Sequence, residues 1–288
     1  MAERQPRKDS HVRPPLPAPA PAVPGGLVDN HTHLDHESDD TVVRGLLAAG
    51  AHVGVPRAVT IGCNLPAAEW TAGAVTRFDQ LLGGVAIHPN TAPRHAADGN
   101  LDDALARIEE LARGPRIAAI SETGLDWFRT DRDDAPARSA QEYSFRAHIE
   151  MAKRLGLPMQ IHDRDAHEDV LRILADEGAP DITVFHCFSG DEQMARFCAG
   201  QGWYLSFAGT LTFKNAHQLR AAAAAVPPGQ LLVETDAPYL TPMPYRGKPN
   251  ASYLIPLTLR ALAQTRSEPE QALAEQITKT SERLYGPW

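Results

Sequence analysis

The 288-residue chain has little of several features that mark particular classes of protein. Its three cysteines, Cys63, Cys187 and Cys198, include no Cys-x-x-Cys pair, which excludes a disulfide-rich scaffold and indicates a reducing compartment. No apolar run reaches the eighteen or so residues that a membrane span needs. The net charge of −8 lacks the positive excess that is typical of proteins that bind duplex DNA tightly.

The chain does contain enough apolar sequence for a large core. Hydrophobic residues make up 43% and charged residues 22%, a composition typical of globular rather than disordered proteins. Residues 1–25 differ, because they are crowded with proline and cannot form an amphipathic face. We therefore expect a disordered Pro-rich N-terminal tail over 1–25 and one domain over 26–288. The tail lacks the leucine-rich run of a signal peptide, so we expect a cytoplasmic protein that does not bind membranes.

From residue 26 onward, short apolar runs alternate with longer amphipathic segments. The apolar runs predict strands within 26–34, 57–62, 81–89, 116–126, 158–165, 182–190, 203–209 and 230–238. Apolar residues that recur every three or four positions predict helices over 40–49, 66–78, 101–112, 140–155, 165–176, 191–199 and 215–225. Eight such units predict an α/β fold, a (β/α)8 TIM barrel, with an open doubly wound sheet as the alternative. The segments 250–266 and 268–286 predict a closing helix and an extra C-terminal helix.

Polar side chains gather at the ends of these predicted strands. They are His31, His33, His88, Glu122, His162, His186 and Asp236. Strand ends share one rim in a barrel, and strand residues two apart point to the same side, so His31 and His33 can bind one ion together. A carboxylate at an apolar strand end is costly unless it is paired or bound to a cation. Each histidine alone could be a packed structural residue, but their convergence predicts a divalent-metal site.

The number of these ligands predicts two ions. A single tetrahedral ion needs fewer than the six side chains His31, His33, Glu122, His162, His186 and Asp236. We therefore expect a dinuclear site in which Glu122 bridges two divalent ions that activate a water molecule. Asp236 could accept the proton of that water, so Glu122 and Asp236 are the expected catalytic residues of a hydrolase. Imidazole ligands favour Zn²⁺ or Mn²⁺ and a phosphoryl substrate favours Mg²⁺, which leaves the metal open.

Seven motifs between Val28 and Pro242 resemble the successive signatures of the TatD-type metal-dependent deoxyribonucleases, which are amidohydrolase-like barrel enzymes. They read VDNHTHLD, AIHP, SETGLDW, MQIHDRDA, VFHCFSG, TFKNA and LLVETDAPYLTP. The resemblance implies one ion at His31, His33, Glu122 and Asp236 and another at Glu122, His162 and His186. It also implies that a further group supports the site or contacts substrate, namely His88, Asp126, Arg164, Ser189, Glu234, Tyr239 and Asn250.

The chain departs from the family pattern at two places. Ser121 stands where the family usually has glycine before the bridging acid. After the last strand, the stretch KPNASYL keeps Asn250 but lacks the Glu-Pro pair that often accompanies it. Neither departure touches a predicted metal ligand, and the second bears on the substrate contact.

Three classes of function are compatible with these motifs. The first is an exonuclease on single-stranded or frayed DNA, or on RNA, acting as a monomer. The second is a dinuclear amidohydrolase-like enzyme for a small amide, lactone or phosphotriester. Many such enzymes bridge their ions with a modified lysine, and Glu122 stands in that place here, which favours the nuclease. The third is a scaffold with a structural metal, which the complete set of hydrolytic ligands disfavours.

Overall fold

Eight parallel strands form one sheet, in which each strand pairs with the next along the chain. They are β1 (Val28–Thr32), β2 (Arg57–Gly62), β3 (Leu81–Val85), β4 (Ile117–Asp126), β5 (Met159–Arg164), β6 (Thr183–Phe185), β7 (Tyr204–Phe207) and β8 (Leu231–Val233). The computed structural model describes residues 16–23, 26–37, 39–131 and 133–288. A parallel bridge between Thr32 and Ala237 brings the two edge strands together. The predicted TIM barrel is therefore confirmed, and the open doubly wound sheet is excluded.

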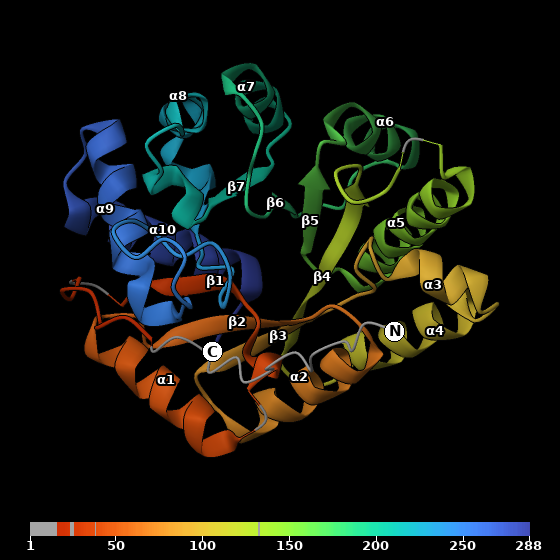
Figure 1. Ribbon diagram of the computed structural model, residues 1–288, viewed down its shortest axis with the longest axis horizontal. Helices are drawn as coiled ribbons and strands as arrows, with labels where there is room; N and C mark the ends of the chain where they lie inside the picture. The colour runs from red at the N-terminus through yellow and green to blue at the C-terminus, as the bar shows by residue number, and fades with distance from the viewer. Residues whose placement is uncertain (1–15, 24–25, 38, 132) are drawn as a thin grey trace, which may run out of the picture.

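Helices surround the strands on the outside of the barrel (Figure 1). They are α1 (Asp40–His52), α2 (Leu65–Arg77), α3 (Ala92–Ala97), α4 (Leu101–Ala112), α5 (Ala135–Leu155), α6 (His167–Glu177), α7 (Glu192–Gly200), α8 (His217–Ala225), α9 (Ile255–Arg266) and α10 (Glu270–Tyr285). The described residues also form the short 3₁₀ helices η1 (Leu34–His36), η2 (Gly209–Thr212), η3 (Pro228–Gln230) and η4 (Ser252–Leu254).

Three helices differ most from the sequence expectation. Helix α9 begins five residues after the predicted start at Asn250, because Ser252–Leu254 form the 3₁₀ helix η4 instead. The six-residue α3 was not predicted, because it is too short to show an apolar period. Helix α5 begins five residues before the predicted start at Ala140, because the side chain of Asp134 accepts the backbone N–H of Ala137 and Pro136 occupies the first turn. The start of α5 is therefore set by its cap rather than by apolar residues.

Side chains complete the junction between β8 and β1. The carboxylate of Asp29 accepts the backbone N–H of Thr235 at 2.9 Å and its hydroxyl at 2.6 Å. The side-chain amide of Asn30 donates to the carbonyl of Val233 at 2.7 Å. Burial raises the pKa of Asp29 to about 6, although the hydrogen bonds from Thr235 oppose that rise. This junction carries the predicted ligands that follow β1 and β8.

Helix α10 packs against the amino end of the barrel. It contacts β1, β8 and the turn η3 that leads into β8. Its residues Leu284 and Tyr285 join an apolar cluster formed by Val59, Ile61, Leu82, Ala118, Ala119, Val184 and Leu232, which come from five of the strands. The predicted extra C-terminal helix is therefore part of the core rather than an appendage.

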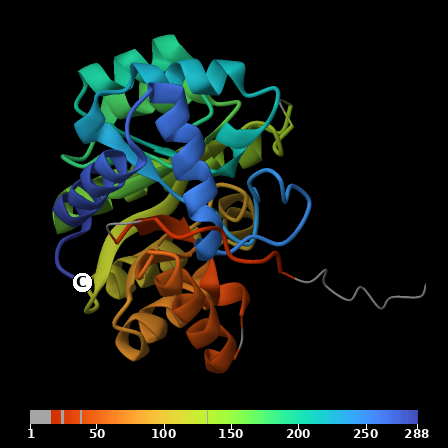
Figure 2. The same ribbon diagram turned by 90° about the vertical axis from the view of Figure 1, so that its left-hand side faces the viewer.

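Part of the predicted tail lies against the barrel. Residues 1–15 and 24–25 fall outside the described residues. Over 16–23 the structure differs from the expected disorder: Val23 is buried, and the hydroxyl of Tyr253 donates to the carbonyl of Pro17 at 3.0 Å. Figure 2 shows this segment beside α9, whose Arg260 donates to two of its carbonyls. These partners are distant in sequence, so no local pattern reveals them.

Within the described residues, no helix combines the length and apolar character needed to cross a bilayer. The three cysteines are free thiols.

A buried histidine outside the rim makes stability depend on pH. The ring N–H of His148 at Nδ1 donates to the carbonyl of Ser144 at 2.7 Å, and Nε2 accepts the N–H of Ile87 at 3.2 Å. Burial lowers the pKa of His148 from 6.5 to about 4. Between these two pKa values the unfolded chain binds a proton at His148 that the folded chain does not bind. The free energy of unfolding therefore falls as the pH drops from 6.5 to about 4, by about 3 kcal/mol in all.

Urea unfolding of the chelator-treated protein at about pH 7, 6, 5 and 4 measures this dependence. His148→Gln removes the titrating group, so its stability should fall less steeply below about pH 6.5 than that of the wild type. The same pH slope in both proteins would show that His148 does not titrate in this way.

Candidate metal centre

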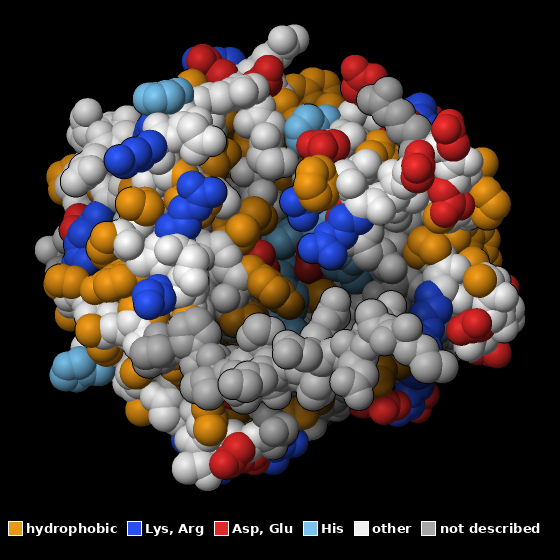
Figure 3. Space-filling view, in the orientation of Figure 1, with side chains coloured by type: hydrophobic (Ala, Val, Ile, Leu, Met, Phe, Trp, Pro, Cys, Tyr) orange, Lys and Arg blue, Asp and Glu red, His pale blue; other side chains and the backbone are white. Residues whose placement is uncertain are grey.

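The structure brings the six predicted ligands together at the carboxyl ends of the strands. His31 lies in β1, Glu122 in β4 and His162 in β5. His33 and His186 directly follow β1 and β6, and Asp236 lies three residues after the end of β8. Within overlapping groups of three, two of which also include Cys63 or His88, the ligand atoms lie within 4.8 Å of one another. In Figure 3 the centre of this face is a hollow with histidine and acidic side chains at its base and Lys or Arg side chains at its edge.

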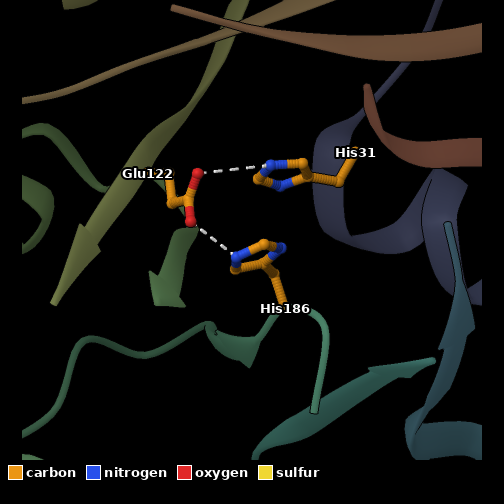
Figure 4. Close-up of side chains that lie close together, drawn as sticks. All are labelled: His31, Glu122 and His186. Carbon is orange, nitrogen blue, oxygen red and sulfur yellow. Dashed lines mark hydrogen bonds and ion pairs between the residues drawn. The ribbon is translucent and has the colours of Figure 1, made fainter. Parts of the chain in front are cut away.

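Glu122 occupies the middle of the cluster and is only 4% exposed. Its Oε1 atom lies 2.5 Å from Nδ1 of His162 and 2.7 Å from Nε2 of His186. Its Oε2 atom lies 3.6 Å from Nε2 of His31 and 3.9 Å from Nε2 of His33. Figure 4 shows the carboxylate between His31 and His186, with one oxygen directed at each ring. The side chain therefore has the position of a carboxylate that bridges two sites.

Asp236 lies on the His31–His33 side of the cluster. Its Oδ1 atom is 3.2 Å from Nε2 of His33 and 3.9 Å from Nε2 of His31. The backbone of Asp236 has a φ of 53°, an uncommon value for a residue with a side chain, and its N–H donates to the carbonyl of His31 at 3.0 Å. The junction between β1 and β8 thus holds this carboxylate against both histidines.

Two further carboxylates orient the imidazoles from outside. Glu234 lies 3.1 Å from Nδ1 of His186 and also accepts the N–H of Cys187 at 2.8 Å. Asp126 lies 3.3 Å from Nε2 of His162 and accepts the side-chain amide of Asn90 at 2.7 Å. Each carboxylate contacts the ring nitrogen that faces away from Glu122, so it fixes which nitrogen is directed at the centre. These contacts are compatible with the supporting role predicted for Glu234 and Asp126, which stays a prediction.

The carboxylates make the centre favourable for positive charge. Burial opposes ionisation of Glu122, but His186, His88 and His162 outweigh it and hold its pKa well below the usual value. Burial likewise opposes protonation of His186, yet Glu122 and Glu234 raise its pKa well above the usual value. Burial also disfavours protonation of His33, and its contacts with Cys63 and Asp236 reverse this and raise its pKa. The same field would attract a divalent cation.

The donor set fits such a cation. The Nε2 atoms of His31 and His33 lie 3.3 Å apart. Two imidazole lone pairs at this separation repel each other unless a proton or a cation lies between them. Imidazole nitrogens and carboxylate oxygens are the ligands that Zn²⁺ and Mn²⁺ accept in hydrolytic sites. The residues present can therefore hold divalent ions.

His88 differs from the other rim histidines. Its Nδ1 atom accepts the backbone N–H of Asn90 at 3.0 Å, so the proton of the neutral ring is on Nε2. That nitrogen lies 3.5 Å from Oε1 of Glu122. Burial lowers the pKa of His88, although Glu122 opposes this, which favours the neutral ring. His88 is therefore a hydrogen-bond donor toward the centre and has no free lone pair there for a metal.

Of the remaining expected residues, three are at least partly exposed and one is buried. Arg164 stacks on the ring of Phe128 at 4.0 Å, and Tyr239 is 52% exposed, with its hydroxyl 3.2 Å from Nε2 of His36. Ser189 donates to the carbonyl of Asp163 at 3.1 Å. Asn250 is buried, and its amide donates to the carbonyls of Thr235 and Tyr239 at 2.9 and 2.6 Å. Asn250 thus holds the loop after β8, and its amide hydrogens are not available to substrate.

Two residues of the site carry no signal in the sequence. The Sγ atom of Cys63, just after β2, lies 3.4 Å from Oε2 of Glu122, and burial raises its pKa to about 12. Gln160 in β5 lies 2.7 Å from Nδ1 of His31. Neither residue is charged or part of a ligand pair. The one sequence feature that could have indicated Gln160 is its position two residues before His162.

Comparison with known proteins agrees with this geometry. The family model for TatD related DNases matches residues 28–286. The chain belongs to the TatD family. A Mycobacterium tuberculosis relative named "Uncharacterized metal-dependent hydrolase TatD" is 43% identical over 263 residues, which cover 90% of this chain and 98% of that protein. The expectation of a metal-dependent hydrolase of this family is thereby confirmed.

Two further TatD-family proteins are informative. A Cronobacter sakazakii protein named "3'-5' ssDNA/RNA exonuclease TatD" is 32% identical over 267 residues, or 90% of this chain and 96% of that protein. The crystal structure of the Escherichia coli TatD homologue YJJV superposes with a TM-score of 0.82 at 24% identity and covers 91% of this chain and 98% of that one. The second likeness shows that the fold is shared.

The contrast between Glu122 and His88 can be tested by metal binding. Glu122→Ala removes both oxygens from the centre, so the metal-stripped variant should retain less Mn²⁺ than the wild type after reloading and dialysis. His88→Asn keeps an acceptor for the N–H of Asn90 and should retain the wild-type amount, because His88 offers no lone pair. Elemental analysis measures both, with circular dichroism as the control for folding. A loss in His88→Asn as large as in Glu122→Ala would make His88 a ligand.

Proposed function

We propose that this TatD-family chain hydrolyses phosphodiester bonds at the ends of single-stranded DNA, with two divalent ions as cofactors. One ion would be held by His31, His33, Glu122 and Asp236, and the other by Glu122, His162 and His186. The observation that carries this proposal is the buried carboxylate of Glu122, which lies within 3.9 Å of imidazoles from three strand ends and from the residue after β1. The name of the Cronobacter relative supports the substrate class.

The protein residues have separate tasks in such a reaction. Divalent ions in this centre would lower the pKa of water and offset the charge on a phosphoryl oxygen. Asp236 presents Oδ1 beside His33 and can accept the proton of an attacking water molecule. His88 presents an N–H toward the centre, and this N–H can donate a hydrogen bond to a phosphate oxygen. Glu234 and Asp126 hold the rings of His186 and His162 in place.

The rim offers a surface for a single strand. Arg164 ends β5, two residues after His162, and Phe128 follows β4, two residues after Asp126. Phe128 is 62% exposed, so one face of its ring is open to a base while Arg164 covers another side. Arg246 stacks in the same way on Phe213, at 4.3 Å. The net charge of −8 gives no overall attraction for a duplex, so local attraction at the rim suits a strand end better.

We further propose that the protein acts as a monomer in the cytoplasm. All six proposed ligands come from one chain, so the centre needs no residue from a partner. The free thiols of Cys63, Cys187 and Cys198 agree with a reducing compartment.

The first experiment uses metal-stripped protein supplied in turn with Mg²⁺, Mn²⁺ and Zn²⁺. The substrates are end-labelled single-stranded DNA, RNA, blunt duplex DNA and a panel of phosphotriesters and lactones. We expect laddered shortening of the single strand from one end, and a loss of rate of about 100- to 10,000-fold in Asp236→Ala. Turnover of a small ester alone, with no nucleic acid cut, would replace the nuclease by the second hypothesis, and inactivity with every ion would leave a structural metal site.

The stacking surface can be tested by kinetics. Phe128→Ala should raise the KM for single-stranded DNA about 10-fold and leave kcat nearly unchanged, because one stacked base is lost and the centre is intact. Turnover of a small phosphodiester that cannot reach Phe128 should not change. The matched control is Phe197→Ala, which removes a 48% exposed phenylalanine from helix α7. Equal KM values in all three proteins would exclude stacking on Phe128.

A further inference from the structure

Gln160 sits inside the barrel and links four parts of the chain. Its side chain is 1% exposed, so all of its polar atoms must find partners within the protein. The amide nitrogen lies 2.9 Å from the carbonyl of Asn30 in β1 and 2.7 Å from the hydroxyl of Tyr285 in α10. The amide oxygen lies 2.8 Å from the hydroxyl of Ser121 in β4 and 2.7 Å from Nδ1 of His31. Two donors and two acceptor positions are thus all filled.

The orientation of this amide follows from its neighbours. A backbone carbonyl can only accept a hydrogen bond, so the atom beside the carbonyl of Asn30 must be the NH₂ group of Gln160. The oxygen of the amide therefore faces Nδ1 of His31. An amide oxygen can only accept, so Nδ1 must carry the proton of the neutral imidazole, and Nε2 is left with the lone pair.

The free lone pair of His31 points at the proposed metal centre. Nε2 is the nitrogen that lies 3.6 Å from Oε2 of Glu122 and 3.9 Å from Oδ1 of Asp236. The plane of the ring is set separately, because it stacks on His186 with the centroids 4.0 Å apart. Stacking alone does not choose between the two ring nitrogens, whereas the hydrogen bond to Gln160 does.

We propose that Gln160 is a positioning residue that fixes the tautomer and the ring rotation of His31, and that Ser121 and Tyr285 hold Gln160 in place. This inference rests on the proposed metal centre for its consequence, and it connects helix α10 at the amino end of the barrel to the chemistry at the rim. It also gives a role to Ser121, the residue at which the chain departs from the family pattern, because glycine at that position has no hydroxyl to donate.

The tautomer can be observed without metal or substrate. Two-bond ¹⁵N–¹H correlation spectra of ¹⁵N-histidine-labelled, metal-free protein distinguish a protonated Nδ1 from a protonated Nε2, and His31→Asn identifies the signals of His31. We expect the Nδ1–H form in the wild type. Gln160→Leu should change the His31 signals towards the other tautomer or a mixture, because Nδ1 then has no acceptor in the amide.

Metal affinity gives the second measurement. Calorimetric titration of the metal-stripped protein with Mn²⁺ should show a Kd about 10- to 100-fold weaker in Gln160→Leu. The matched control is Gln230→Leu, which removes another amide that donates to two backbone carbonyls, those of Ala199 and Trp203, at the opposite end of β8 from Asp236. Its Mn²⁺ affinity and the His31 signals should equal those of the wild type.

A second variant covers the case in which Gln160→Leu does not fold. The double variant Ser121→Ala with Tyr285→Phe removes two hydroxyls that hold the amide and leaves Gln160 in place, and it should weaken Mn²⁺ binding about 3- to 10-fold. Unchanged His31 signals and unchanged Mn²⁺ affinity in the folded Gln160 variant, or in the double variant, would overturn the inference. A wild type that shows the Nδ1–H form but binds no Mn²⁺ would instead overturn the proposed metal centre.

Discussion

The carboxylate of Glu122 is the constraint on which the rest of the site depends. It is buried, and an ionised carboxylate in such a place is tolerated only beside positive charge or hydrogen-bond donors. Imidazoles from several strand ends meet this need, so the register of those strands has to place them around one residue. The pairing of Gly124 with His162 shows how closely two of these strands approach. A Cβ on Gly124, whose φ is 139°, would lie 2.0 Å from the carbonyl oxygen of His162. Gly124, two residues after Glu122, therefore allows β4 and β5 to approach closely.

The two ends of the barrel are coupled through its interior. At the rim, side chains of Asp29 and Asn30 join β1 to β8 and hold His31 and Asp236 side by side. At the amino end, Tyr285 of α10 reaches Gln160, which contacts His31 from below. A barrel interior is usually filled by apolar layers, so a connected row of polar groups across it is costly unless each member is hydrogen-bonded. In this row the amide of Gln160 is fully paired, whereas the side-chain oxygen of Asn30 has no hydrogen-bond partner among the described residues.

The division of labour in this chain is typical of a TIM barrel: residues at the carboxyl ends of strands supply chemistry, and the remainder supplies stability. The TatD-family match covers residues 28–286, so it includes both. Three uncharged residues, Cys63, Ser121 and Gln160, also lie in or beneath the site. Cys63 contacts Glu122, and Ser121 contacts Gln160, which in turn contacts His31.

Much of the architecture can be predicted from the sequence, because hydrophobic period is a local property. Eight strands and most helices follow from runs of a few residues. The clustering of the six candidate ligands follows from the rule that parallel strand ends share an edge. The start of α5 depends on a cap, and the short α3 has no period, so neither follows from this pattern. Three other features could not be predicted in this way. The packing of residues 16–23 and the contact of Gln160 with His31 join residues far apart in the chain. The proton on Nε2 of His88 depends on which neighbour its other ring nitrogen meets. Strand register and barrel closure decide these contacts, since a shift of one residue turns each strand side chain to the other face of the sheet.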